Sequence, residues 1–136
     1  MSSIDVSQSD GDSRAVRGSR FSSPAESLLR ISVPPGTPIL AAAAGRVSLV
    51  QGTAASGGYG EFTCIQHTRA LSTCYAHQQR IQVAAGQFVD RGQAIGTTGC
   101  TGRCFGAHLH FEVRLEDRPT CPALYLGASP SSMCAA

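Results

Sequence analysis

Hydrophobic and polar residues alternate most regularly over residues 106–114. The polar positions are His108, His110, Glu112 and Arg114, and the apolar positions are Leu109, Phe111 and Val113. Because side chains of an extended chain point alternately to its two sides, the two sets lie on opposite faces. The pattern predicts a half-buried β-strand that presents two imidazoles in the same direction. Such a pair can share a metal ion, or one imidazole can bind the metal while the other transfers protons.

Shorter apolar or alternating runs, separated by glycine and proline, predict further strands. They lie at 31–33, 38–40, 46–50, 61–67, 71–77, 81–83 and within 86–96. Turns are expected at 34–37 and in the glycine-rich stretch 52–60. Long helical periodicity is hard to find, so the sequence predicts an all-β domain: one small antiparallel sheet, similar to a barrel-sandwich.

The runs 61–67 and 71–77 predict a hairpin around a three-residue loop. This register places Cys64 directly opposite Cys74, at a separation that a disulfide can close. The same alternation places His77 on the face opposite Cys74. His67, at the turn, is expected to be a surface residue.

Six cysteines in 136 residues indicate an oxidising compartment and up to three disulfides. A Cys100–Cys104 disulfide would close the loop before the histidine strand. The alternative is a Cys2His2 zinc site formed with His108 and His110. Cys121 and Cys134 either form a third bridge or stay free.

Composition limits the classes of function. The net charge of +2, with scattered arginines and no lysine, does not predict a nucleic-acid surface, and no apolar run is long enough to span a membrane. Residues 1–25 are expected to be a disordered leader or linker and 128–136 a flexible tail. No signal peptide is visible after Met1, although the cysteines indicate an extracytoplasmic protein.

Several short motifs occur in one order along the chain. They are Gly-Thr-Pro at 36–38, Ala-Ala-Gly-Arg-Val at 43–47, Gly-Tyr-Gly at 58–60, Thr-Cys-Tyr-Ala-His at 73–77, Gly-Gln-Phe-Val at 86–89, Gly-Gln-Ala-Ile-Gly at 92–96 and Gly-Ala-His-Leu-His-Phe-Glu at 106–112. Together they resemble the M23 (lysostaphin-like, LytM-type) zinc peptidases, over about residues 31–126. The resemblance implies an M23-type β-domain at 26–127 that acts on bacterial peptidoglycan peptides.

Residue by residue, the resemblance implies catalytic roles for His77 and His108 and a zinc-ligand role for His110. Zinc would polarise the scissile carbonyl and activate a water molecule, while the other two imidazoles transfer protons and stabilise the oxyanion.

The family's other two zinc ligands are a His and an Asp in the spacing His-x-x-x-Asp. Counting back from Gly36 places Glu26 and Arg30 at these positions. Glu26 could act as a substitute oxygen ligand, but Arg30 stays charged and repels a cation. At an effective dielectric of about 20, a unit charge and a dication about 4 Å apart repel by roughly 8 kcal/mol. Zinc is therefore expected to bind weakly or not at all.

Two functions follow. The first is a catalytically impaired M23 domain that binds peptidoglycan peptides or regulates a cell-wall hydrolase. The second is an active zinc endopeptidase that cleaves peptidoglycan peptides with rearranged metal ligands.

Overall fold

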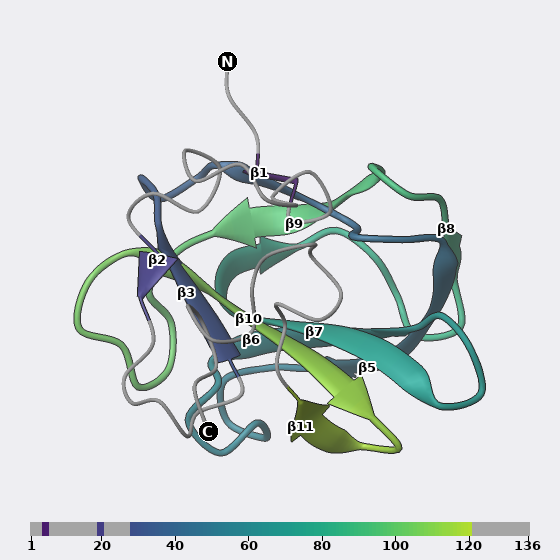
Figure 1. Cartoon of the computed structure of the whole chain (residues 1–136). Helices are drawn as coiled ribbons and strands as arrows, with labels where there is room; N and C mark the ends of the chain where they lie inside the picture. The colour runs from purple at the N-terminus through teal and green to yellow at the C-terminus, as the bar shows by residue number, and fades with distance from the viewer. Residues whose placement is uncertain (1–3, 6–18, 21–27, 121–136) are drawn as a thin grey trace.

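The computed structural model describes residues 4–5, 19–20 and 28–120, and these residues form eleven strands and no helix (Figure 1). The strands are β1 (Ile4–Asp5), β2 (Ser19–Arg20), β3 (Leu28–Ser32), β4 (Pro38–Leu40), β5 (Gly45–Gln51), β6 (Glu61–Gln66), β7 (Leu71–Ile81), β8 (Phe88–Val89), β9 (Ala94–Thr98), β10 (His108–Leu115) and β11 (Arg118–Thr120). They form one sheet in which every pairing except β1 with β4 is antiparallel. The predicted all-β fold with a single, mainly antiparallel sheet is confirmed.

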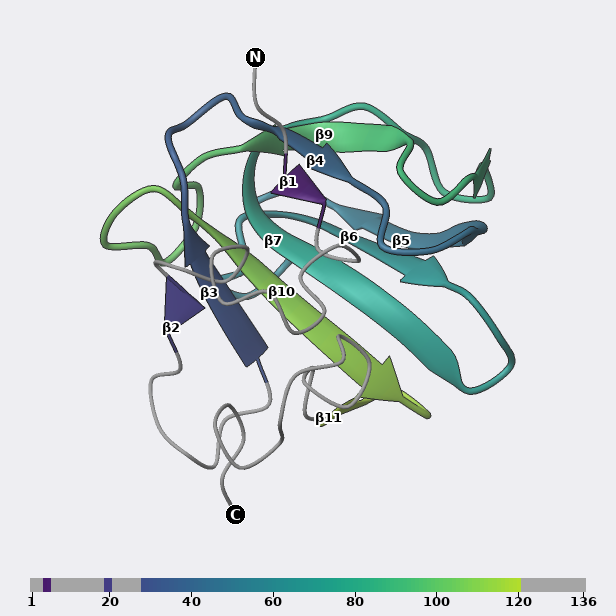
Figure 2. The ribbon, with the colours of Figure 1, turned by 45° about the horizontal axis from the view of Figure 1, so that its top comes forward.

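The two long strands β7 and β10 form the centre of the sheet and run side by side (Figure 2). β10 pairs with β7 on one edge and with β3 and β11 on the other, while β7 also pairs with β6 and β9. The predicted histidine strand is therefore confirmed as β10, and strands lie on both of its edges.

Alternation along these strands produces two faces. One face carries the main core, in which the rings of Tyr75 and Phe111 lie 5.4 Å apart. Its buried members are Leu29, Ile31, Ile39, Ala41, Val47, Ile65, Tyr75, Val83, Val89, Ile95, Leu109, Phe111 and Val113. The other face buries a smaller cluster made of Phe62, Cys64, Cys74 and Ala76. The second face also carries the polar side of β10.

The predicted strand at 81–83 does not form as a separate element. Instead β7 continues past His77 to Ile81, through a register shift between Gln78 and Arg80, and pairs with β9 at Gly96. One long bent strand replaces the two short ones because β9 offers a second partner beyond the hairpin.

Parts of the expected organisation lie beyond the described ranges. Two short strands, β1 and β2, occur within the expected leader, and the boundaries of leader, domain and tail stay predictions. Glu26, Cys121 and Cys134 lie outside the described residues. In the described part of the chain, no helix is long and apolar enough to cross a membrane.

His67 is not a simple surface residue, contrary to the prediction. Its Nδ1–H donates to the carbonyl of Ala44 at 2.8 Å, and its Nε2 lies 2.7 Å from the hydroxyl of Thr73. That hydroxyl contacts the Tyr75 hydroxyl at 2.8 Å, which accepts the backbone N–H of Ala42 at 2.9 Å. A chain of hydrogen bonds thus joins β7 to the segment before β5.

Both predicted disulfides form. Cys64 and Cys74 are cross-strand partners on β6 and β7 and are bonded, and Cys100 is bonded to Cys104. The hairpin bridge lies in the smaller buried cluster beside Phe62. Because Cys74 is the register partner of Glu112, the bridge lies on the same face of the sheet as the polar side of β10.

Removing the hairpin bridge tests its contribution to stability. We expect the double variant Cys64→Ala, Cys74→Ala to lose about 3 kcal/mol of unfolding free energy, because a loop of about ten residues is no longer closed in the unfolded chain. Urea unfolding of the oxidised parent and the variant measures this. A loss below about 1 kcal/mol would contradict the assignment of the bridge as a stabilising element.

The His67 network predicts a pH effect on stability. Burial lowers the pKa of His67, and the hydrogen bond to Ala44 only partly opposes this. In the unfolded chain His67 becomes protonated near the ordinary histidine pKa, whereas in the folded chain it stays neutral to lower pH. The unfolding free energy therefore falls as the pH drops through about 6.5.

We expect the unfolding free energy of the parent to fall more between pH values of about 7.5 and 5.5 than that of His67→Gln. His77 and His108 also have lowered pKa values, but they contribute equally to both proteins. Parallel pH profiles for the two proteins would refute the proposed role of His67.

Candidate functional site

Three histidines meet on the second face of the sheet. His77 comes from β7, and His108 and His110 come from β10. One ring nitrogen from each lies within 4.8 Å of the others, and the ring of His77 is 5.0 Å from that of His108 and 5.5 Å from that of His110. The structure therefore brings together all three histidines that the sequence selected, while their individual roles stay predictions.

His77 reaches this site through an unusual backbone conformation. Strict alternation predicted that it lies opposite Cys74, yet it lies on the same face as His110 and Cys74, which makes that prediction wrong. The cause is its φ of 58°, a left-handed conformation that non-glycine residues rarely adopt and that interrupts the alternation. Its backbone N–H donates to the carbonyl of Tyr59 at 2.7 Å. Strain of this kind is concentrated at functional sites.

Each imidazole donates one N–H to a fixed acceptor. His77 Nδ1–H donates to the carbonyl of Thr101, and His108 Nδ1–H donates to the carbonyl of Gly106, both at 2.7 Å. His110 Nε2–H donates to Glu112 Oε2 at 2.7 Å. Because carbonyl and carboxylate oxygens only accept, the second nitrogen of each neutral ring carries a lone pair. His108 Nε2 is buried and has no hydrogen-bond partner.

Glu112 orients His110, and the sequence reasoning assigned it no role. Its carboxylate is 2% exposed and accepts hydrogen bonds from His110, from the Tyr59 hydroxyl at 2.9 Å and from Arg114 Nε at 2.9 Å. Burial alone would raise the pKa of Glu112, but the hydrogen bonds and charges of His110 and Arg114 outweigh it and lower the pKa. The signal in the sequence was its position on the polar side of β10, two residues after His110.

Two loops hold the acceptor for His77. The backbone of Gly60 lies so close to Thr101 that any Cβ there would overlap it, and Gly60 also has a φ of 70°. The Thr101 hydroxyl accepts the N–H of Glu61 at 3.0 Å and donates to the carbonyl of Gln78 at 2.5 Å. The glycine-rich loop and the loop closed by Cys100–Cys104 thus fix the Thr101 carbonyl together.

Burial favours the neutral form of two of the three imidazoles, those of His77 and His108. It lowers the pKa of His77 to about 4, although the hydrogen bond to Thr101 opposes the shift and the nearby charges of His110, His108 and Arg30 add to it. Burial also lowers the pKa of His108, and Arg30 contributes in the same direction. His77 and His108 therefore present lone pairs rather than positive charges to the site.

Arg30 stands beside this cluster. It is the cross-strand partner of His110 on β3, so its side chain leaves the sheet on the same face. It lines an open groove of about 490 Å³ with His77 and His108, and Arg103 and Phe105 form the rim of that groove. The position that the motif comparison gave to a metal ligand is therefore beside the histidines and holds a guanidinium.

The residues present do not fit the zinc site of the family. Of the three ligand positions that the resemblance implies, one holds His110, one holds Arg30, which cannot donate a lone pair, and the third, Glu26, lies outside the described residues. The alternative Cys2His2 site is also wrong: Cys104 Sγ lies 3.7 Å from His108 Nδ1, but it is bonded to Cys100. Three converging imidazole lone pairs remain, and they could hold a cation only against the charge of Arg30.

Parts of several known proteins are similar to this chain. The peptidoglycan DD-endopeptidase ShyB of Vibrio cholerae is 40% identical over 88 residues, 65% of this chain and 20% of the relative. The DD-carboxypeptidase/endopeptidase Mpg of Neisseria meningitidis is 38% identical over 91 residues, 67% of this chain and 20% of the relative. The chain spans about a fifth of the length of these curated relatives.

A solved structure of a zinc-containing peptidase from Vibrio cholerae superposes with a TM-score of 0.67 and 34% identity, over 76% of this chain and 30% of that one. The family model described as peptidase family M23 matches residues 26–122. This match includes the three histidines, Arg30 and the loops that position them. The chain therefore belongs to peptidase family M23.

Proposed function

We propose that this protein is a bacterial, extracytoplasmic M23 domain that binds peptidoglycan peptides in the groove beside His108 and hydrolyses them poorly. It would act as a wall-binding module or as a regulator of a cell-wall hydrolase. The name of the relative ShyB, a peptidoglycan DD-endopeptidase, supports the peptidoglycan substrate, and two disulfides support an oxidising compartment.

The observation that carries the proposal is the pairing of Arg30 with His110 across β3 and β10. In a working member of the family, zinc polarises the scissile carbonyl and activates water. A guanidinium at a ligand position removes one ligand and adds a repelling charge. The protein therefore keeps the groove but lacks the ligands and the charge that would hold a zinc ion there.

The remaining residues are suited to hold a peptide. His77 Nε2 and His108 Nε2 can accept hydrogen bonds from backbone N–H groups because their Nδ1–H groups are already committed to Thr101 and Gly106. Phe105, which is 99% exposed, offers apolar surface at the groove rim. Binding needs only these contacts, whereas hydrolysis would also need stabilisation of a developing oxyanion.

One observation favours the second candidate, an active zinc endopeptidase with rearranged ligands. The ligand atoms of His77, His108 and His110 lie within 4.8 Å of one another, and three imidazoles form the zinc site of some hydrolytic enzymes. This arrangement would turn the two histidines with expected catalytic roles into metal ligands. The positive charge of Arg30 disfavours a metal ion at these three histidines.

Wall binding and wall lysis by the unmodified protein separate the two candidates. We expect the protein to co-sediment with purified peptidoglycan, to carry well under one zinc per chain after purification without added metal, and to leave the turbidity of the suspension unchanged. Co-sedimentation in the presence of chelator should be equally strong. Chelator-sensitive lysis with about one zinc per chain would establish the second candidate instead.

Restoring both ligands tests why zinc is lost. We expect Glu26→His with Arg30→Asp to bind about one zinc per chain, because His110 then completes a three-ligand site with an open fourth position. Each single variant should bind far less, since two ligands hold zinc weakly. Elemental analysis of all four proteins measures this, with turbidity loss as a second readout. Equal zinc contents in the four would show that Glu26 and Arg30 are not at ligand positions.

A further inference from the structure

We infer that Arg30 and His108 form a receptor for the free carboxyl terminus of a peptide, with the terminal carboxylate paired to the Arg30 guanidinium and the N–H of the last residue donated to His108 Nε2. This inference rests on the proposed function and names the ligand of that groove. It changes the nature of the site, from one that binds a cation to one that binds an anion.

The first reason is the charge of Arg30. In the part of the chain that the structure describes, no Asp or Glu forms an ion pair with Arg30. Arg114, on the same face, differs because it is paired with Glu112 at 2.9 Å and lies over the rings of Tyr59 and Phe62. Arg30 is half-buried at the wall of the groove, where its charge is partly shielded from water and an incoming carboxylate would be bound more strongly than at an open surface.

The second reason is the composition of the groove. None of its described lining residues is acidic, and Arg103 adds a second guanidinium at the rim. The histidines add no competing negative charge, and the one buried carboxylate nearby, Glu112, is already bound by three donors. The field in the groove therefore favours an anion.

The third reason is the free acceptor at His108. Its Nε2 is buried and has no partner in the structure, while its Nδ1–H is held by Gly106. A buried acceptor without a partner is costly, so a ligand that supplies an N–H there gains affinity. The acceptor cannot bind the carboxylate itself, because a neutral ring nitrogen without a proton does not donate.

The spacing of the two groups fits one amino-acid residue. His108 is the register partner of Ser32 and His110 that of Arg30, so Arg30 and His108 are diagonal neighbours across β3 and β10. Diagonal neighbours lie roughly 7–8 Å apart at their Cα atoms, and the long Arg30 side chain shortens the distance from its charge to the imidazole. A terminal residue carries its carboxylate and its N–H on the same Cα, so it can meet both groups at once.

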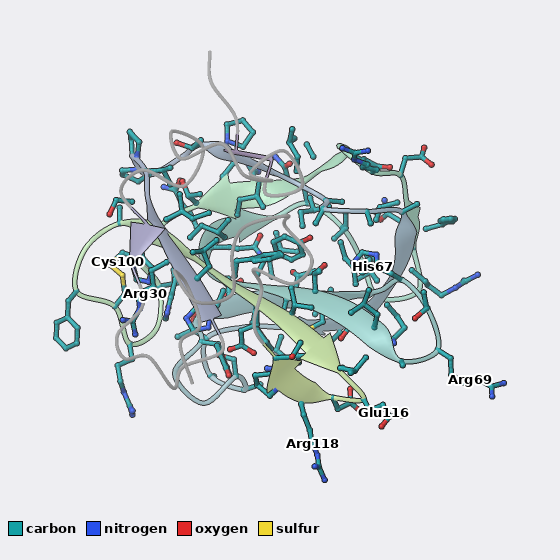
Figure 3. All side chains as sticks on the ribbon, viewed as in Figure 1. Arg30, His67, Arg69, Cys100, Glu116 and Arg118 are labelled. Carbon is teal, nitrogen blue, oxygen red and sulfur yellow. A yellow bond between two sulfur atoms is a disulfide. The ribbon has the colours of Figure 1, made fainter. Side chains whose placement is uncertain are left out.

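This pairing distinguishes peptide ends from internal peptide bonds. An internal residue can donate an N–H to His108 but carries no charge for Arg30, whose guanidinium would then lose water without gaining a partner. Arg69 lies in the loop between β6 and β7, on the opposite side of the view from Arg30 (Figure 3), and is exposed to solvent. A substitution of Arg69 therefore removes the same charge as a substitution of Arg30 but leaves the groove unchanged, so it is a matched control.

The test uses N-acetyl-D-alanyl-D-alanine as free acid and as C-terminal amide, titrated into the whole protein in chelator-containing buffer and followed by calorimetry or NMR. D-residues are chosen because the relatives are named as DD-peptidases. We expect the acid to bind about tenfold or more tightly than the amide, the size of one charge-assisted hydrogen bond. Arg30→Gln should bind the acid as weakly as the amide, while Arg69→Gln should behave like the parent.

His108→Ala should weaken the acid and the amide by similar factors, because both carry the donated N–H. Arg30→Lys keeps the positive charge and should therefore keep part of the preference for the acid over the amide. This result would show that the loss of preference in Arg30→Gln comes from the lost charge and not from misfolding. Equal affinity of the parent for acid and amide, or an unchanged preference in Arg30→Gln, would overturn the inference.

Co-sedimentation with peptidoglycan separates this failure from failure of the proposed function. A parent that binds the wall but does not prefer the acid refutes only the carboxylate receptor. A parent that binds neither the wall nor either probe refutes both proposals.

Discussion

The structure depends on the antiparallel pairing of β10 with β3 on one side and β7 on the other. This pairing forms one row across three strands, in which His110 lies between Arg30 and Ala76. Cross-strand neighbours share a face, so the register alone decides which side chains meet. A slip of one residue would move the histidines into the apolar core, where Leu109 and Phe111 now lie.

Most groups on the polar face form hydrogen bonds with one another or with nearby loops, whereas His108 Nε2 is buried without a partner. Glu112 keeps its charge with three donors around it, and each imidazole commits one N–H to an acceptor fixed by a loop or by Glu112. Such outer contacts set the tautomer and the direction of each lone pair. The site is thus pre-organised by residues that do not themselves point into the groove, with Thr101 as an example.

A fixed frame of this kind allows the chemistry to change at one position. Glu112, the left-handed His77 and the disulfide loop do not depend on the identity of residue 30, since none of them forms a hydrogen bond with it. An acidic residue there would add one ligand for a cation, whereas Arg30 supplies the opposite charge to the same groove. The frame of the groove and the charge inside it are therefore set by different residues.

The sequence by itself determined the features that follow from local periodicity and spacing. Alternation identified β10 and the shared direction of His108 and His110, and the hairpin register identified Cys64–Cys74. The resemblance to the M23 motif, counted back from Gly36, placed Arg30 at the site. Tertiary structure decided the rest: the face of His77, the three partners of Glu112, the network of His67 and the continuation of β7 to Ile81. The reason is physical. A period of two describes a regular strand, but a positive φ and a distant hydrogen-bond partner arise only when separate segments pack together.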